Sequence, residues 1–238
     1  MAAFTYGVVV YLVFLVTFIY AIGFVGNIGV PRGLDSPAIA PALESLLIDL
    51  GLLAIFAVQH SVMARKGFKA WWTKIVSPSV ERSTYVLASS LALGALCGHW
   101  HPIEGAVWSI QDSTAVTAIQ AVFWLGWGIL LLATFLINHF ELFGLRQTYA
   151  ALTGRAIPQQ EFRTPFLYQH VRHPIYLGFV LSFWATPEMT LGHLLFAAGA
   201  TGYILVGVWF EERDLVAHFG DRYRDYRKKV GMLFPRLG

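Results

Sequence analysis

Apolar residues gather in six runs along the chain, at about 6–28, 44–63, 83–100, 117–140, 174–187 and 189–210. All but one approach the ~20 residues that a helix needs to cross a bilayer. Run 174–187 is shorter, and Pro187-Glu188 separates it from the last run, which predicts a helical hairpin whose first leg need not cross fully. The pattern therefore predicts an all-α, polytopic integral membrane bundle of five to six helices, with a C-terminal helical hairpin and a polar helical tail.

Composition agrees with a membrane protein. Hydrophobic residues make up 56% of the 238 residues and charged residues only 13%, whereas a soluble domain carries ~25% charged residues. The single cysteine, Cys97, excludes a disulfide framework and any multi-cysteine metal site. The first apolar run lacks a basic start and is too long for a cleaved signal peptide, so we expect it to be retained.

Basic residues predict the orientation. Of the 17 Lys and Arg residues, 16 lie in segments 65–82, 146–172 and 213–236. These segments share one side of the membrane if the N- and C-termini are cytoplasmic, as the positive-inside rule requires. We therefore expect a protein of the inner (cytoplasmic) membrane with both termini and the helical tail in the cytosol.

Two polar clusters bracket the predicted hairpin. Arg172-His173-Pro174 opens its first leg, where a helix N-terminus favours negative charge, and Glu211-Glu212 follows its second leg, where carboxylates can bind a cation or a ligand amino group. A hairpin returns its second leg beside the start of its first, so the two clusters should meet. The alternatives are an ordinary interface cap and a solvated charge cluster.

Two further clusters lie at the same predicted interface. His139 and Glu141 follow the fourth run, and His60 and Arg82 flank the loop between the second and third runs. Polar groups near membrane depth are expensive and usually face the protein interior, where they can move protons or orient a substrate. Hydrogen bonds that only support packing are an equal alternative.

Several function classes lack their motifs. The chain contains no phosphate-binding G-x-x-x-x-G-K-[ST] loop, no dinucleotide-binding G-x-G-x-x-G after a strand and no G-x-S-x-G nucleophile elbow. Its histidines do not form the clustered pairs of a di-iron enzyme, so no metal is expected, and no nucleic-acid partner is expected either. The polar clusters share one face, which disfavours a transporter with a midplane site.

The C-terminal motifs resemble a membrane methyltransferase superfamily. Arg172-His173-Pro174-x-Tyr176, Glu211-Glu212-x-x-Leu215 and Phe219-Gly220-x-x-Tyr223-x-x-Tyr226 are similar, in order and spacing, to the isoprenylcysteine carboxyl methyltransferase and phospholipid methyltransferase families. The upstream segments 59–65, 81–85 and 138–147 resemble one branch of it, methanethiol S-methyltransferase. Together these motifs extend the resemblance over most of the chain.

The resemblance implies S-adenosylmethionine as methyl donor and a small lipophilic thiol as acceptor, most simply methanethiol giving dimethyl sulfide. It implies a division into transmembrane helices (1–143) and a donor-binding loop, hairpin and tail (144–238) within one integrated domain. The implied donor-binding residues are Gln147, Phe162, Arg163, Tyr168, Arg172, His173, Pro174, Ile175, Tyr176, Glu211 and Glu212. The candidates for catalysis are His60, Arg82, His139 and Glu141.

One departure from the superfamily bears on the acceptor. The prenylcysteine enzymes carry an arginine a turn before the glutamates, whereas this chain reads Val206-Gly207-Val208-Trp209, which argues against a carboxylate acceptor. The alternatives left open are another thiol, a prenylcysteine carboxylate, a phospholipid amine, or a non-catalytic membrane protein of nitrogen-oxide metabolism. The bilayer is the expected environment, and the sequence leaves the oligomeric state open.

Overall fold

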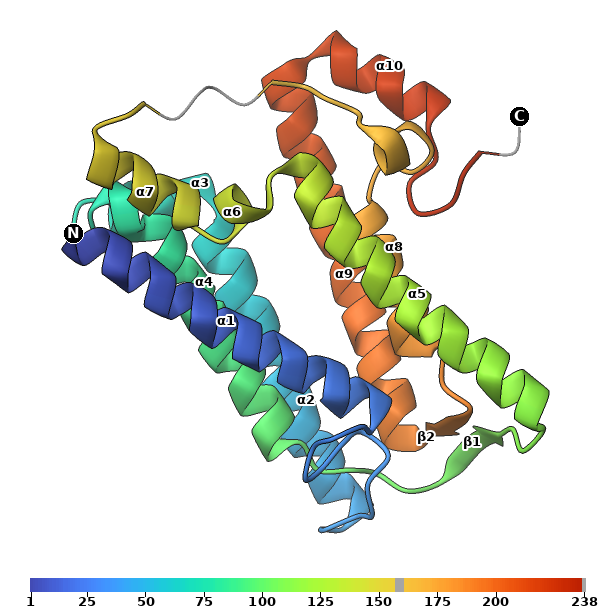
Figure 1. Ribbon diagram of the computed structural model, residues 1–238. Coiled ribbons are helices and arrows are strands. Elements are labelled where there is room, and N and C mark those ends of the chain that lie inside the picture. Colours follow the sequence, from blue (N-terminus) through green and yellow to red (C-terminus); the bar gives the residue numbers. More distant parts are fainter. Residues whose placement is uncertain (157–160, 237–238) are drawn as a thin grey trace. The chain divides into compact units, whose positions relative to one another are not determined.

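The computed structural model describes residues 1–156 and 161–236 and confirms the all-α membrane architecture (Figure 1). Its helices are α1 (Ala2–Gly26), α2 (Ala42–Ala64), α3 (Lys66–Trp72), α4 (Pro78–His99), α5 (Ser113–Ile137), α6 (His139–Leu142), α7 (Leu145–Thr153), the 3₁₀ turn η1 (Phe166–Gln169), α8 (Pro174–Trp184), α9 (Leu191–Phe219) and α10 (Asp221–Lys229). Two short strands, β1 (Ala106–Ser109) and β2 (Glu188–Thr190), pair with each other and were not predicted.

Four helices among the described residues are long and apolar enough to cross a membrane: α1, α2, α5 and α9. Helix α4 is not among them, because it mixes serines, Glu81 and Arg82 with its apolar residues. Helix α8 has only 11 residues and starts at Pro174, which suits the first turn because proline lacks the N–H that would be unpaired there. The short first leg and its break before α9 are as predicted.

The last long helix continues well past its apolar part. Helix α9 runs through Glu211 and Glu212 to Phe219, so the beginning of the tail is a helical extension of the last span, as predicted. The chain then turns at Gly220, whose φ of 59° lies in the left-handed region that glycine adopts readily. Helix α10 follows and carries the aromatic and basic residues.

The chain forms two compact units. The first holds the described residues of 1–105, 139–159 and 190–193, and the second holds those of 106–138, 160–189 and 194–238. These units are defined by the contacts within each of them. The predicted division into residues 1–143 and 144–238 separates transmembrane helices from donor-binding segments, and it stays a prediction.

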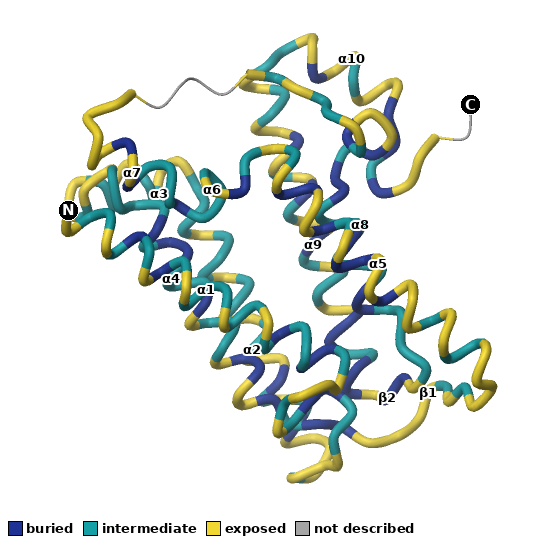
Figure 2. Tube along the Cα trace, viewed as in Figure 1, coloured by how far each residue is buried: buried dark blue, intermediate teal, exposed yellow. Residues whose placement is uncertain are grey.

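In the first unit, α1 and α2 pack against α4, and α7 packs against both α1 and α4 (Figure 1). The turn between α6 and α7 reaches α4 closely, since a Cβ on Gly144 would lie 2.5 Å from the Ser83 hydroxyl. Phe14 and Phe143 stack with their ring centroids 3.9 Å apart. Helix α2 buries only Ser45 and Asp49, so most of its surface is partly or fully exposed (Figure 2).

In the second unit, α5 and α8 cross at a contact between glycines. A Cβ on Gly178 would lie 2.6 Å from the carbonyl oxygen of Gly126, and a Cβ on Gly126 would lie 2.4 Å from the Ser182 hydroxyl. The Ser182 hydroxyl donates to the Phe123 carbonyl at 3.0 Å. Small residues of this kind let membrane helices approach closely without a hydrophobic driving force. The contact fixes α8, which begins directly after Arg172 and His173 of the polar cluster described next.

Candidate functional site

The two polar clusters that bracket the hairpin meet in the second unit, as predicted. The Arg172 Nε lies 2.7 Å from the Glu212 Oε1, and the His173 Nε2 lies 3.2 Å from the same oxygen. Arg227 of α10 adds a third contact, with its Nε 3.3 Å from the Glu212 Oε2. Since the side chains of Arg172 and Glu212 are only 9% and 10% exposed, the ion pair is largely shielded from water.

The neighbouring carboxylate has a different environment. Glu211 is 44% exposed, and its Oε2 accepts a hydrogen bond of 2.9 Å from the Tyr176 hydroxyl. Its Oε2 also lies 3.9 Å from the Nδ1 of His173, which is charged only when protonated. Glu212 is thus contacted by three protein groups, two of them arginines, whereas Glu211 presents a carboxylate to solvent.

The C-terminal segment fixes the start of α8 through backbone hydrogen bonds. The Arg172 N–H donates to the Gly231 carbonyl at 2.9 Å, and the His173 N–H donates to the Met232 carbonyl at 3.1 Å. Val171 and Gly231 form a parallel β-bridge, and the Arg172 guanidinium donates to the Val230 carbonyl. The residues after α10 therefore hold Arg172 and His173 in place, a role that the sequence did not suggest.

Three tyrosines lie beside the glutamates. The Tyr226 hydroxyl donates to the Tyr168 carbonyl at 2.5 Å, and burial raises the pKa of Tyr226 to about 12. Burial, reinforced by the charges of Glu212 and Glu211, also raises the pKa of Tyr223. Burial and the Glu211 charge raise the pKa of Tyr168. All three hydroxyls therefore stay protonated at neutral pH.

Tyr223 carries an unsatisfied group. It is 2% exposed, and its hydroxyl finds no hydrogen-bond partner among residues 1–156 and 161–236. Buried hydroxyls are normally paired, and each exception calls for a reason. A ligand group beside Glu211 would supply that partner.

Phe162 packs into the same region. Its ring lies 5.3 Å from the Phe219 ring and 5.4 Å from the Tyr226 ring, between centroids, and the Arg222 guanidinium lies 5.7 Å from the Phe162 ring centroid. Arg163 instead forms an exposed ion pair with Glu161 at 2.7 Å. Pro174 is buried in the first turn of α8 and Ile175 is partly exposed. The structure thus groups ten predicted donor-binding residues in the second unit, and their roles toward a donor stay predictions.

The candidates for catalysis lie in the first unit, together with Gln147. His60 is engaged through both ring nitrogens: its Nε2 lies 2.9 Å from the Tyr85 hydroxyl and its Nδ1 lies 3.1 Å from the Ser89 hydroxyl. The Arg82 Nε donates to the Leu142 carbonyl at 2.7 Å, and its guanidinium lies 5.0 Å from the Tyr85 ring centroid. Tyr85 therefore links His60 and Arg82.

His139, Glu141 and Gln147 follow one another closely near α6 and α7. The buried His139 Nε2 lies 2.7 Å from the Tyr11 hydroxyl of α1, a contact that the sequence did not predict. Glu141 pairs with Arg146 at 2.5 Å, and the Gln147 amide donates to the Glu141 carbonyl at 3.1 Å. The Gln147 Oε1 is buried and has no partner in the described part of the chain. Each of these side chains is held in a defined position.

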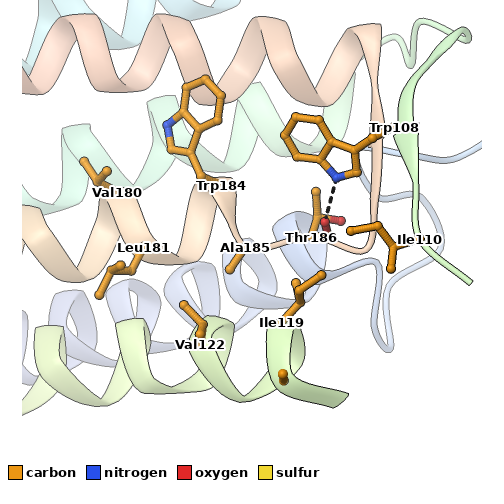
Figure 3. Close-up of a pocket in the computed structure, with 10 residues that line it drawn as sticks. Trp108, Ile110, Ile119, Val122, Val180, Leu181, Trp184, Ala185 and Thr186 are labelled. Atoms are coloured by element: carbon orange, nitrogen blue, oxygen red, sulfur yellow. Dashed lines mark hydrogen bonds between the residues drawn. The ribbon is translucent and has the colours of Figure 1, made fainter. Parts of the chain in front are cut away.

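An apolar cavity of about 440 Å³ lies in the second unit between α5, α8 and β1 (Figure 3). The indole N–H of Trp108 donates to the Thr186 carbonyl at 3.0 Å and that of Trp184 to the Thr201 hydroxyl at 2.9 Å, so both indoles have their polar atoms satisfied by protein groups. None of the predicted site residues is among the residues that line it. The cavity is therefore separate from the glutamate cluster.

Apolar spanning helices, together with a charge cluster at the start of the hairpin, define an integral membrane helical bundle with a largely buried ion-pair cluster. Comparison with known proteins gives the family. The chain is 57% identical to methanethiol S-methyltransferase of Mycobacterium tuberculosis over 97% of its length and 94% of the relative. It is 52% identical to methanethiol S-methyltransferase of Crocosphaera subtropica over 98% of its length and 91% of that relative. The chain belongs to the methanethiol S-methyltransferase family, which confirms the resemblance in its motifs.

Two further comparisons complete the picture. The chain is 30% identical to nurim of Sus scrofa over 73% of its length and 69% of that protein. No protein-family model and no solved structure matches the chain. Since the relatives at 52–57% identity are named as methyltransferases, the family implies a methyl donor.

Proposed function

We propose that this protein transfers the methyl group of S-adenosylmethionine to methanethiol and produces dimethyl sulfide. The observation that carries the proposal is the identity of 57% over nearly the full length to a protein named methanethiol S-methyltransferase. The overall reaction forms one carbon–sulfur bond at the thiol, breaks one at the donor and releases the thiol proton.

The glutamate cluster suits the amino-acid end of this donor. A half-exposed carboxylate at Glu211 can accept hydrogen bonds from an ammonium group, and the buried Tyr223 hydroxyl offers a second polar contact beside it. Glu212 is already neutralised, so we assign it to holding Arg172 and His173 in position. When bound, the donor supplies an electrophilic methyl group on a sulfonium.

Aromatic residues of the same unit extend this donor-binding assignment. Phe162 offers a ring face close to Arg222, Tyr168 lies in η1 before α8, and Tyr176 lies in the first turn of α8. Aromatic faces attract a positively charged group such as a sulfonium. We therefore assign Phe162, Tyr168 and Tyr176 to donor binding. Their match to the motifs of the family supports the same assignment for Arg163, Pro174 and Ile175 and, independently, for Gln147.

The acceptor must lose a proton, because a thiolate is the stronger nucleophile. A cysteine-like thiol has a pKa near ~8.5, so a base or a nearby cation assists at neutral pH. We assign the proton-accepting role to His139 or His60, and we assign stabilisation of the thiolate to Arg82. Glu141 stays a candidate that acts with Arg146, its ion-pair partner.

The distribution of Lys and Arg supports a cytoplasmic location for both termini and for the tail that carries α10. This orientation places the donor-binding residues on the side where a soluble cytosolic donor is available. Insertion in the cytoplasmic membrane belongs to the same proposal.

Acceptor competition tests the proposal. Purified protein is incubated with S-adenosylmethionine and equal concentrations of methanethiol, a longer thiol, a prenylcysteine and a phospholipid amine, and the methylated products are quantified. We expect methylation of methanethiol to dominate. Preferential methylation of another acceptor would overturn the substrate assignment, and absence of donor binding in calorimetry would favour a non-catalytic membrane protein.

A further inference from the structure

Helix α3 begins where a membrane span ends. Helix α2 is long and apolar enough to cross a bilayer, and it ends at Ala64. Only Arg65, which is extended, separates it from α3 at Lys66 (Figure 1). So short a connection keeps the seven residues of α3 at the boundary between the bilayer and water.

The surface around α3 combines cations with exposed apolar side chains. We define the α3 surface as Lys66, Lys69, Trp71, Lys74 and Ile75. Lys66 and Lys74 are exposed and Lys69 is partly buried, while Trp71 and Ile75 are 51% and 66% exposed. An exposed indole and an exposed isoleucine are unfavourable in water, but tryptophan is favoured at the level of lipid headgroups.

The aromatic residues of α3 form a cluster of their own. The Phe68 ring lies 5.5 Å from the Trp71 ring and 5.8 Å from the Trp72 ring, between centroids. These contacts hold Trp71 at the surface beside the lysines. The exposed Trp71 ring is therefore supported by the protein itself.

The charge balance of this segment determines the partner. Residues 65–82 contain five basic residues and a single acidic one, Glu81. Whatever ion pairs form there, an excess of positive charge remains. Basic residues near a membrane surface attract anionic lipids, and apolar side chains that enter the headgroup region add to the binding.

We propose that the α3 surface binds the anionic headgroups of bilayer phospholipids, with Lys66 and Lys74 contacting phosphates, the partly buried Lys69 adding positive charge, and Trp71 and Ile75 entering the edge of the hydrocarbon. This interaction would anchor segment 65–77 between α2 and α4, the helix that carries Arg82. It does not depend on the proposed methyl transfer.

Native mass spectrometry of the full chain in detergent tests the proposal, with phosphatidylglycerol and phosphatidylcholine as probes. The test variant is Lys66→Gln/Lys69→Gln/Lys74→Gln. The matched control, Arg224→Gln/Lys228→Gln/Lys229→Gln, removes the same charge from α10. There Arg224 pairs with Asp221 at 2.7 Å and Lys228 with Asp225 at 2.9 Å.

We expect the wild type and the control to prefer phosphatidylglycerol, and the test variant to lose up to about a hundredfold of that preference, at about fivefold per lysine. Lys66→Arg/Lys69→Arg/Lys74→Arg should retain the preference and so separate charge from folding. Equal binding of the two lipids by the wild type, or an unchanged preference in the test variant, would overturn the proposal.

Discussion

Separate replacement of Glu211 and Glu212 by glutamine should produce two different defects. Glu211→Gln removes the negative charge that we assign to the donor ammonium. A hydrogen bond to a charged group contributes about 1.5–3 kcal/mol. Because Glu211 is 44% exposed, we expect the lower part of that range, which corresponds to roughly 10- to 30-fold weaker donor binding. Stability should be unchanged.

Glu212→Gln should instead destabilise the fold. The substitution leaves the Arg172 guanidinium, 9% exposed, without its anion. Removing one partner of a buried ion pair costs about 3–5 kcal/mol, because the remaining charge stays away from water. Thermal melting followed by intrinsic fluorescence should show a clearly lower melting temperature for Glu212→Gln and a wild-type value for Glu211→Gln.

Calorimetric titration with S-adenosylhomocysteine, the demethylated donor, measures the affinity of each folded variant. Glu211→Asp provides a control that keeps the charge. If Glu211→Gln binds like the wild type, while Glu212→Gln melts like the wild type but fails to bind, the two roles are reversed and our reading of the cluster is wrong.

Three further predictions concern the supports of the site. Gly178→Ala should lower the melting temperature by overpacking, at a cost of about 1–3 kcal/mol, whereas Gly128→Ala, where a Cβ would meet nothing within 4 Å, should not. In the same melting assay, Arg172→Gln should be strongly destabilising because the Arg172 side chain is only 9% exposed. Arg227→Gln should be nearly neutral because the Arg227 side chain is 46% exposed and water screens its ion pair. The folded-state pKa of Tyr226 is raised to about 12 from the usual value near 10. The protonated Tyr226 hydroxyl therefore stabilises the fold below pH 10, and this stabilisation should be lost between pH 10 and 12. Melting temperatures of the wild type across this pH window should fall more steeply than those of Tyr226→Phe.

The sequence predicted the parts of this molecule that follow from local patterns. Apolar runs of membrane-spanning length gave α1, α2, α5 and α9. The break at Pro187 predicted the hairpin. The hairpin in turn predicted that the glutamate pair lies near Arg172, and the Arg172 Nε does lie 2.7 Å from the Glu212 Oε1. The order and spacing of the motifs indicated the family.

The division of roles between Glu211 and Glu212 could not be predicted. Adjacent residues on a helix point about 100° apart, so one can face inward and the other outward, but the sequence does not state the rotation of α9. Only the packing of Arg172, His173 and Arg227 shows that Glu212 is the inward residue.

Contacts between distant segments could not be predicted from the sequence either. Tyr11 meets His139 across 128 residues, and Gly231 pairs with Val171 through backbone groups that carry no sequence signal. Strands β1 and β2 have four and three residues, too few to show the alternation that marks a strand.

The central claim is tested most directly by the product of a single reaction. Purified protein is mixed with methanethiol and S-adenosylmethionine labelled with ¹³C in its transferable methyl group, and the headspace gas is analysed by mass spectrometry. We predict dimethyl sulfide that carries one ¹³C per molecule and increases with time and protein concentration. Unlabelled dimethyl sulfide, or none above the protein-free control while the protein remains folded, would contradict the proposed function.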